Sequence, residues 1–181
     1  MLCAAALIGF QAYGQNLVVN PGFETGDFTG WTVNAGATGV VGPGFDGWNP
    51  HSGDFFAALG PVGGDGTMSQ SFAASGFYDI SFWMGSDGAT PNDFTASFGG
   101  AVLYTATDIP NTQPNYTFFE FDNVAAGDGV LLFSFRNDPA YLALDDVSVT
   151  VSSGVPDSGS TMAMMSAGLL GLGGIARKLR R

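Results

Sequence analysis

Hydrophobic and polar residues alternate in short runs along most of this chain. In the run 79–84, Ile80, Phe82 and Met84 fall on one face of an extended strand, and their neighbours fall on the other. A period of two is typical of a β-strand with one buried face. Turn residues such as Asn20-Pro21-Gly22 separate the runs, and between residues 15 and 151 no window of 12 or more residues keeps helical periodicity.

Ten runs between residues 15 and 151 predict strands. Their ranges are 16–19, 30–33, 54–59, 68–72, 77–84, 94–98, 101–105, 116–121, 130–135 and 141–151. So many short strands at this spacing favour an all-β fold, an antiparallel jelly-roll β-sandwich. We expect Trp31 and Trp83 in its core. Trp48 lies in a turn-rich loop and is the best candidate for an exposed ring, and the alternative is that it packs over an end of the sandwich.

Residues 2–10 are apolar and mostly small, and Ala12-Tyr13-Gly14 follow them. This pattern is typical of a secretory signal peptide with its cleavage site before Gln15. The basic segment that normally precedes the apolar one is missing, so we expect either a start upstream of Met1 or a weak signal. The alternative is that residues 1–14 form an apolar first strand.

The other end of the chain has three parts. A small polar linker with a short Val-Pro-Asp-Ser-Gly sequence covers residues 152–161, an uncharged run covers 162–176, and four cations stand in 177–181. A helix of that uncharged run reaches roughly 22 Å, which spans a hydrocarbon core of about 30 Å only if the bilayer thins and the flanking cations snorkel. We expect a transmembrane helix with a basic cytoplasmic tail. The alternative is an amphipathic helix packed on the domain.

Charge and composition narrow the function. Between residues 15 and 151 stand 15 of the 16 acids and only one cation, Arg136, which gives this segment a formal charge of −14. Such a domain is not expected to bind nucleic acid. The chain has one cysteine, Cys3, which excludes an internal disulfide framework and a multi-cysteine zinc site. It has one histidine, His51, which excludes any site that needs two imidazoles.

At the C-terminal end, Val155, Pro156, Asp157, Ser158 and Gly159 are followed by the apolar run and the basic tail. This tripartite arrangement resembles the VPDSG variant of the PEP-CTERM sorting signal. The resemblance implies export, processing by an exosortase-type membrane enzyme, tethering through the C-terminal helix, and delivery to the cell surface or an extracellular matrix.

Inside the domain, the sequence NPGFE at residues 20–24 precedes Gly30-Trp31, and LDDVSV at 144–149 closes the last predicted strand. In this order the motifs resemble carbohydrate-binding modules of the galactose-binding-like sandwich. The resemblance implies one structural Ca²⁺ held by Glu24, Asp145 and a backbone carbonyl near Ser52. The alternative is that the two carboxylates are solvated or accept hydrogen bonds from backbone amides.

A sugar ligand would stack on a flat aromatic ring flanked by polar groups, and Trp48 with His51 is the candidate pair.

An enzyme is not expected. The chain has no Gly-x-Ser-x-Gly sequence, and the mature domain has neither a thiol nor a lysine. A glycosidase pair of carboxylates stays open, because sequence gives no distances.

The sequence thus predicts an exported, non-catalytic module that binds extracellular polysaccharide. A structural surface or biofilm protein without a sugar site is the alternative, and a glycoside hydrolase is a remote third.

Overall fold

The computed structural model describes residues 14–152. The predicted signal peptide, sorting motif, transmembrane helix and basic tail lie outside this range, apart from Gly14 at its start and Ser152 at its end. Within residues 14–152, no helix has the length and hydrophobicity needed to cross a bilayer.

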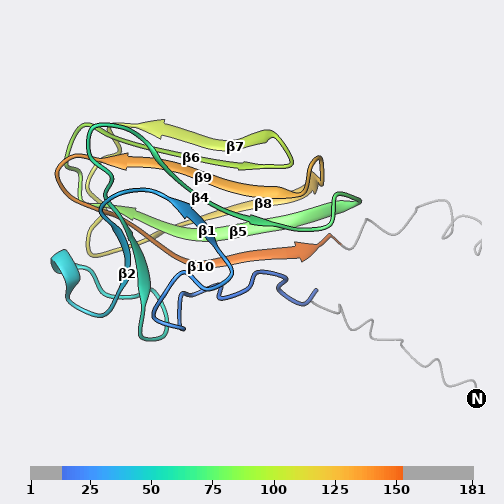
Figure 1. Ribbon diagram of the computed structural model, residues 1–181, viewed down its shortest axis with the longest axis horizontal. Helices are drawn as coiled ribbons and strands as arrows, with labels where there is room; N and C mark the ends of the chain where they lie inside the picture. The colour runs from blue at the N-terminus through green and yellow to red at the C-terminus, as the bar shows by residue number, and fades with distance from the viewer. Residues whose placement is uncertain (1–13, 153–181) are drawn as a thin grey trace, which may run out of the picture.

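Ten antiparallel strands form two five-stranded sheets packed face to face (Figure 1). The strands are β1 (Thr32–Asn34), β2 (Thr38–Val41), β3 (Phe56–Leu59), β4 (Gly66–Ser71), β5 (Phe77–Ser86), β6 (Asn92–Phe98), β7 (Ala101–Thr107), β8 (Thr117–Ala125), β9 (Val130–Asn137) and β10 (Leu142–Val151). The first sheet has the order β1-β4-β9-β6-β7 and the second the order β2-β3-β10-β5-β8. The prediction of an all-β antiparallel sandwich is confirmed.

The main core lies between the sheets and follows the predicted alternation. In β5, Ile80, Phe82 and Met84 are buried while the residues between them are only half-buried. Phe82 meets Phe133 of the opposite sheet edge to face, with ring centroids 5.3 Å apart. Trp31 packs in this core as predicted. Burying a large apolar side chain contributes about 1.5–3 kcal/mol, so these facing rings supply much of the stabilisation.

A second, smaller cluster lies on the outer face of the second sheet. The loop 42–55, which contains the short 3₁₀ helix η1 (Phe45–Gly47), folds back over β3 and β10 and buries Trp48 against Phe56. Trp48 is 0% exposed, so the expectation of an exposed ring was wrong and the alternative of a packed loop residue is what the structure shows. The space for its ring exists because Gly85 of β5 has no side chain: a Cβ there would lie 2.4 Å from Trp48 Cη2.

Two strand predictions also need correction. Residues 16–19 form no strand, although this segment runs beside β10 and the Leu17 amide donates to the Val149 carbonyl at 2.8 Å. Strand β2 was not predicted, because its sequence TGVV contains only two apolar side chains and a glycine.

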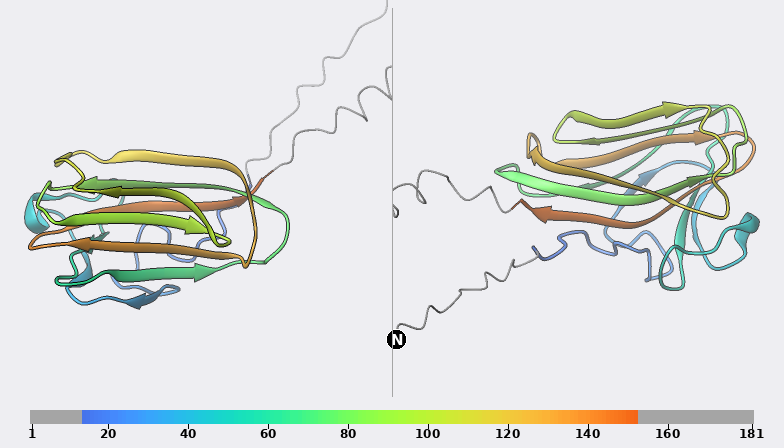
Figure 2. Two further views of the ribbon diagram at one scale, coloured as in Figure 1. Left: turned by 90° about the horizontal axis from the view of Figure 1, so that it is seen from above. Right: turned by 180° about the vertical axis from the view of Figure 1, so that it is seen from behind.

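Both ends of the described chain leave the sandwich at the same end. Gly14 lies next to Thr150 and Val151, close to the point where β10 ends. Helix η1 and its loop lie at the opposite end (Figures 1 and 2). A tether at residue 152 would therefore leave the η1 end of the domain free.

Candidate functional site

Trp83 lies on the outer face of the second sheet, not in the core as predicted. The alternation of β5 turns Ile80, Phe82 and Met84 inward, so Trp83 must point outward and is only half-buried. Its neighbours across the sheet are Asp145 of β10 and Phe118 of β8. The imidazole of His51, from the loop 42–55, stacks on Trp83 with ring centroids 3.9 Å apart and an interplanar angle of 18°.

An open pocket of about 320 Å³ lies beside this stack. Its lining combines aromatic rings, prolines and two amides: Asn49, Pro50, His51, Trp83, Pro114, Asn115 and Tyr116. Tyr116 stands edge-on to His51 at 5.7 Å and donates its hydroxyl hydrogen bond to the Asn49 carbonyl at 3.0 Å. Burial, reinforced by the nearby charges of Asp145 and Asp146, raises the pKa of Tyr116, so this hydroxyl stays protonated.

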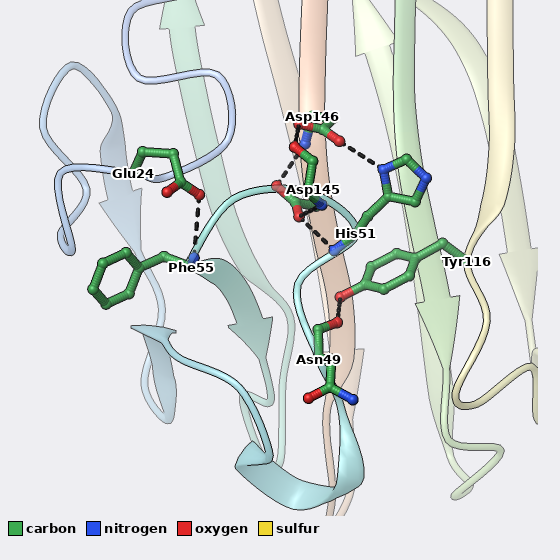
Figure 3. Close-up of polar contacts among 8 residues, drawn as sticks. Glu24, Asn49, His51, Phe55, Tyr116, Asp145 and Asp146 are labelled. Carbon is green, nitrogen blue, oxygen red and sulfur yellow. Dashed lines mark hydrogen bonds and ion pairs between the residues drawn. The ribbon is translucent and has the colours of Figure 1, made fainter.

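Behind the pocket, β10 carries a bulge that aims two consecutive carboxylates at one loop. The register of β10 against β5 shifts between Asp145 and Ser148, and Asp146 has a φ of 48°, in the left-handed region. Side chains of consecutive strand residues normally point to opposite faces, and a bulge breaks that alternation. As a result, both carboxylates contact the segment His51–Ser52 (Figure 3).

Asp145 is fully buried and accepts only backbone hydrogen bonds. Its Oδ2 takes the amides of His51 and Ser52 at 2.8 and 3.2 Å, and its Oδ1 takes the amide of Asp146 at 2.8 Å. Burial raises the pKa of Asp145 to about 7, and the negative charge of Asp146 adds to this shift as the second cause. The three amides act in the opposite direction, because they stabilise the ionised form.

Asp146 contacts two side chains of the same loop. Its Oδ2 lies 2.6 Å from His51 Nδ1, and its Oδ1 accepts the hydroxyl of Ser52 at 2.7 Å. The loop is thus held to β10 through its backbone by Asp145 and through its side chains by Asp146, and His51 is fixed against Trp83.

Glu24 holds the next part of the same loop. Its carboxylate accepts the amide of Phe55 at 3.1 Å (Figure 3) and the amide of Asp54 at 2.9 Å. Gly22 lies beside Glu24 and both aspartates. A Cβ built on Gly22 would lie 3.3 Å from Asp146 Oδ1, 3.5 Å from Asp145 Oδ1 and 3.6 Å from Glu24 Cγ.

These acids can be tested as a cation site. Among residues 14–152, no group of three or more His, Cys, Asp or Glu side chains is arranged to hold a metal ion. A calcium site of two carboxylates completed by main-chain oxygens does not need such a group. Arg136, the cation of the described domain, pairs with Asp138 on the first sheet and leaves the buried Asp145 without a positive partner. The oxygens of Glu24 and Asp145 accept backbone amides, which is the alternative stated above, so a cation bound here would have to share these oxygens with the amides.

Of the predicted site residues, the structure brings His51, Ser52, Glu24 and Asp145 together around one loop and separates Trp48 from them in the covered cluster. Sequence reasoning missed Trp83, Tyr116 and Asp146. The alternation of β5 already places Trp83 outward and could have identified it. Nothing in the sequence reveals the bulge that turns Asp146 toward His51.

Comparison with known proteins gives the chain two likenesses. Residues 154–179 match the VPDSG-CTERM motif. The chain is also 30% identical over 119 residues to a lipase of Pseudomonas fluorescens, in a match that covers 58% of this chain and 24% of the lipase. This chain thus spans about a quarter of that relative.

Solved structures share the fold. The carbohydrate-binding module TmCBM61, solved with β-1,4-galactotriose, has a TM-score of 0.58 at 20% identity and covers 76% of this chain and 99% of its own. The C-terminal family 22 carbohydrate-binding module of Clostridium thermocellum Xyn10B has a TM-score of 0.53 at 13% identity, with 76% and 94% covered. The K3 adhesin domain of the Porphyromonas gingivalis Lys-gingipain has 0.53 at 16%, with 75% and 98% covered.

The alternating strands, the two-sheet topology and the solved structures all indicate the same fold. The described domain has the β-sandwich fold of carbohydrate-binding modules, and the chain carries a VPDSG-CTERM sorting motif behind it.

Proposed function

We propose that this protein is an exported, surface-attached carbohydrate-binding module that binds extracellular polysaccharide without cleaving it. The observation that carries the proposal is the pocket of Trp83, His51 and Tyr116 on the open face of the second sheet. The C-terminal motif would be read by an exosortase-type enzyme, which is the partner its family implies.

The chemistry of the pocket suits a sugar. Aromatic side chains offer apolar surface to the C–H face of a pyranose ring, while the amides of Asn49 and Asn115 and the ring nitrogen of His51 can bond its hydroxyls. A volume of about 320 Å³ matches the lower end of small-ligand sites. The pocket is open to solvent, so a ligand can reach it from outside.

The position of the pocket suits a tethered protein. Residue 152 leaves the sandwich at the end opposite helix η1, and the pocket-lining residues Asn49, Pro50 and His51 follow η1 directly. A domain attached through its C-terminal segment would present this pocket away from the attachment point.

Binding without hydrolysis is supported by the lining of the pocket, which contains no carboxylate side chain. Both mechanisms of glycoside hydrolysis require two carboxyl groups that flank the scissile bond. Asp145 and Asp146 stand behind His51 and are engaged with the loop 51–52.

Affinity electrophoresis through gels containing β-1,4-galactan or xylan tests the proposal. We expect retardation of the wild type by at least one of these polymers and about tenfold or more weaker binding for Trp83→Ala, a loss of about 1.4 kcal/mol. Phe77→Ala is the matched control, because Phe77 is an exposed aromatic on the same strand, six residues from Trp83.

Two results would count against the proposal. Equal retardation of wild type and Trp83→Ala would move the binding site elsewhere. Absence of retardation in every polysaccharide tried, together with calcium-dependent self-association, would favour the structural surface protein.

We further propose that Glu24 and Asp145, with a main-chain oxygen near Ser52, hold one Ca²⁺ when it is present. The ion would supply the positive charge that these acids lack and would fix the loop 51–55 to β10. We expect EDTA to lower the Tm of the wild type and to leave Glu24→Gln unchanged, with the exposed Glu120→Gln as control. A wild-type Tm that does not respond to EDTA or to added CaCl₂ would contradict this proposal.

A further inference from the structure

The two ring nitrogens of His51 have different surroundings. Nδ1 lies 2.6 Å from Asp146 Oδ2, whereas no hydrogen bond joins Nε2 to any group among residues 14–152. Figure 3 shows the second nitrogen pointing away from the two aspartates. Because His51 lines the pocket with Trp83 and Tyr116, Nε2 is the polar atom that this side chain can offer to a ligand.

The contact with Asp146 determines which nitrogen carries the proton. An ionised carboxylate only accepts hydrogen bonds, so Nδ1 must donate. In a neutral imidazole, Nε2 then has a lone pair and acts as an acceptor. Turning the ring by 180° about its Cβ–Cγ bond would keep it stacked on Trp83, but it would place Cδ2 where Nδ1 lies and so break the bond to Asp146.

Asp146 reaches His51 only because of the bulge in β10. Its φ of 48° is uncommon for a residue other than glycine, and bulges often re-aim a side chain at a functional site. The backbone of His51 is anchored separately by Asp145, at 2.8 Å. Asp146 therefore contacts the imidazole ring of His51, whereas Asp145 holds the backbone of the same residue.

We infer that Asp146 is a positioning residue that fixes the Nδ1–H tautomer of His51, so that the pocket presents a hydrogen-bond acceptor and selects neutral, hydroxyl-bearing sugars over sugar acids. The inference rests on the proposed function. A hydroxyl can donate to Nε2. A carboxylate cannot donate, and it would also face the negative charge of the aspartates behind the ring.

Long-range ¹H–¹⁵N NMR on the full chain tests the role of Asp146 without any ligand. His51 is the one histidine of the chain, so a protein made without a histidine tag gives a single imidazole signal. At a pH where the spectrum itself shows a neutral imidazole, we expect the proton on Nδ1 in the wild type. In Asp146→Asn, the new amide can donate to Nδ1, and we expect the proton to move to Nε2.

Asp54→Asn is the matched control. Asp54 is exposed in the same loop and forms no hydrogen bond or ion pair with His51, so we expect this variant to remove one charge and to leave the tautomer unchanged. A wild-type imidazole with its proton on Nε2, or the same tautomer in Asp146→Asn as in the wild type, would overturn the assignment.

Ligand selection is tested with β-1,4-galactan and the same polymer after oxidation of its C6 hydroxyls to carboxylates. We expect the wild type to prefer the neutral polymer by about tenfold or more, and Asp146→Asn to lose most of that preference while Asp54→Asn keeps it. An unchanged preference in Asp146→Asn would contradict the inference. If the wild type binds neither form of galactan nor any other polysaccharide tried, the proposed function and the ligand class fall together, while the NMR result still decides the role of Asp146.

Discussion

Gly85 shows how a single residue decides where a neighbouring side chain lies. It sits in β5 next to Met84, and the Trp48 ring occupies the space above its Cα: a Cβ would lie 2.4 Å from Cη2 and 2.6 Å from Cζ3. The ring also stands edge-on to Tyr116 at 5.3 Å. Trp48 thus supports the pocket from behind, although it does not line it.

Gly85→Ala is expected to destabilise the domain by about 1–3 kcal/mol, because a rigid ring and its cover must shift to admit the methyl group. Gly39→Ala is the control, since a Cβ at Gly39 of β2 would meet nothing within 4 Å. Urea unfolding followed by tryptophan fluorescence measures both. Equal free energies of unfolding for the two variants would contradict this expectation and would mean that Trp48 and the loop above it shift without cost.

Asp145 gives the domain a pH dependence. Its pKa in the folded state is raised from an ordinary 3.8 to about 7 by burial and by the charge of Asp146. Between these two values the folded state binds more protons than the unfolded state, so stability falls as pH rises through this window. We expect a loss on the order of 2–4 kcal/mol between about pH 4 and pH 7 in EDTA.

Denaturant titrations at several pH values in EDTA check this expectation, with Asp145→Asn as the comparison. The amide does not titrate, so its contribution to the slope disappears. Stability of the chelated wild type that rises steadily from acid to neutral pH would contradict the raised pKa.

Among the strands, the number of buried faces determines whether the sequence shows an alternating pattern. β6 and β9 alternate throughout and β5 alternates as far as Met84, and all three were predicted close to their true bounds, because one face of each meets the core and the other faces outward. All four residues of β3 are buried, since the loop 42–55 covers its outer face. Its run FAAL has no alternation, so the sequence could locate this strand but could not say what covers it.

The order of strands predicts which backbone amides are best protected. β9 and β10 lie in the middle of their sheets, whereas β1, β7, β2 and β8 form the edges. We expect hydrogen–deuterium exchange to be slowest in β9 and β10 and fastest in the edge strands, because a central strand opens only with its neighbours. Peptide-level mass spectrometry measures this, and protection of β7 equal to that of β9 would be inconsistent with the sheet order.

For the whole molecule, charge is the dominant property. The segment 15–151 carries a formal −14, and its Arg136 is already paired with Asp138. Mutual repulsion among the acids opposes the compact state and weakens as salt screens it. The same field disfavours anionic ligands, in agreement with a neutral sugar as the proposed ligand.

We therefore expect the Tm of the domain to rise by a few degrees when NaCl increases from about 10 to 200 mM in EDTA. Differential scanning calorimetry at constant pH measures the shift. A Tm that falls with salt would mean that attractive ion pairs outweigh the repulsion.

The sequence by itself determined the fold class, the inward rows of the regular strands and the sorting motif, because each is encoded in local patterns of a few residues. It also selected Glu24, His51, Ser52 and Asp145 as site candidates, and these four lie around one loop. Only the tertiary structure decided that Trp48 is covered, that Trp83 forms the pocket and that Asp146 faces His51. Those outcomes depend on a loop folding over a glycine and on a bulge in β10, and both arise from contacts between residues far apart in the chain.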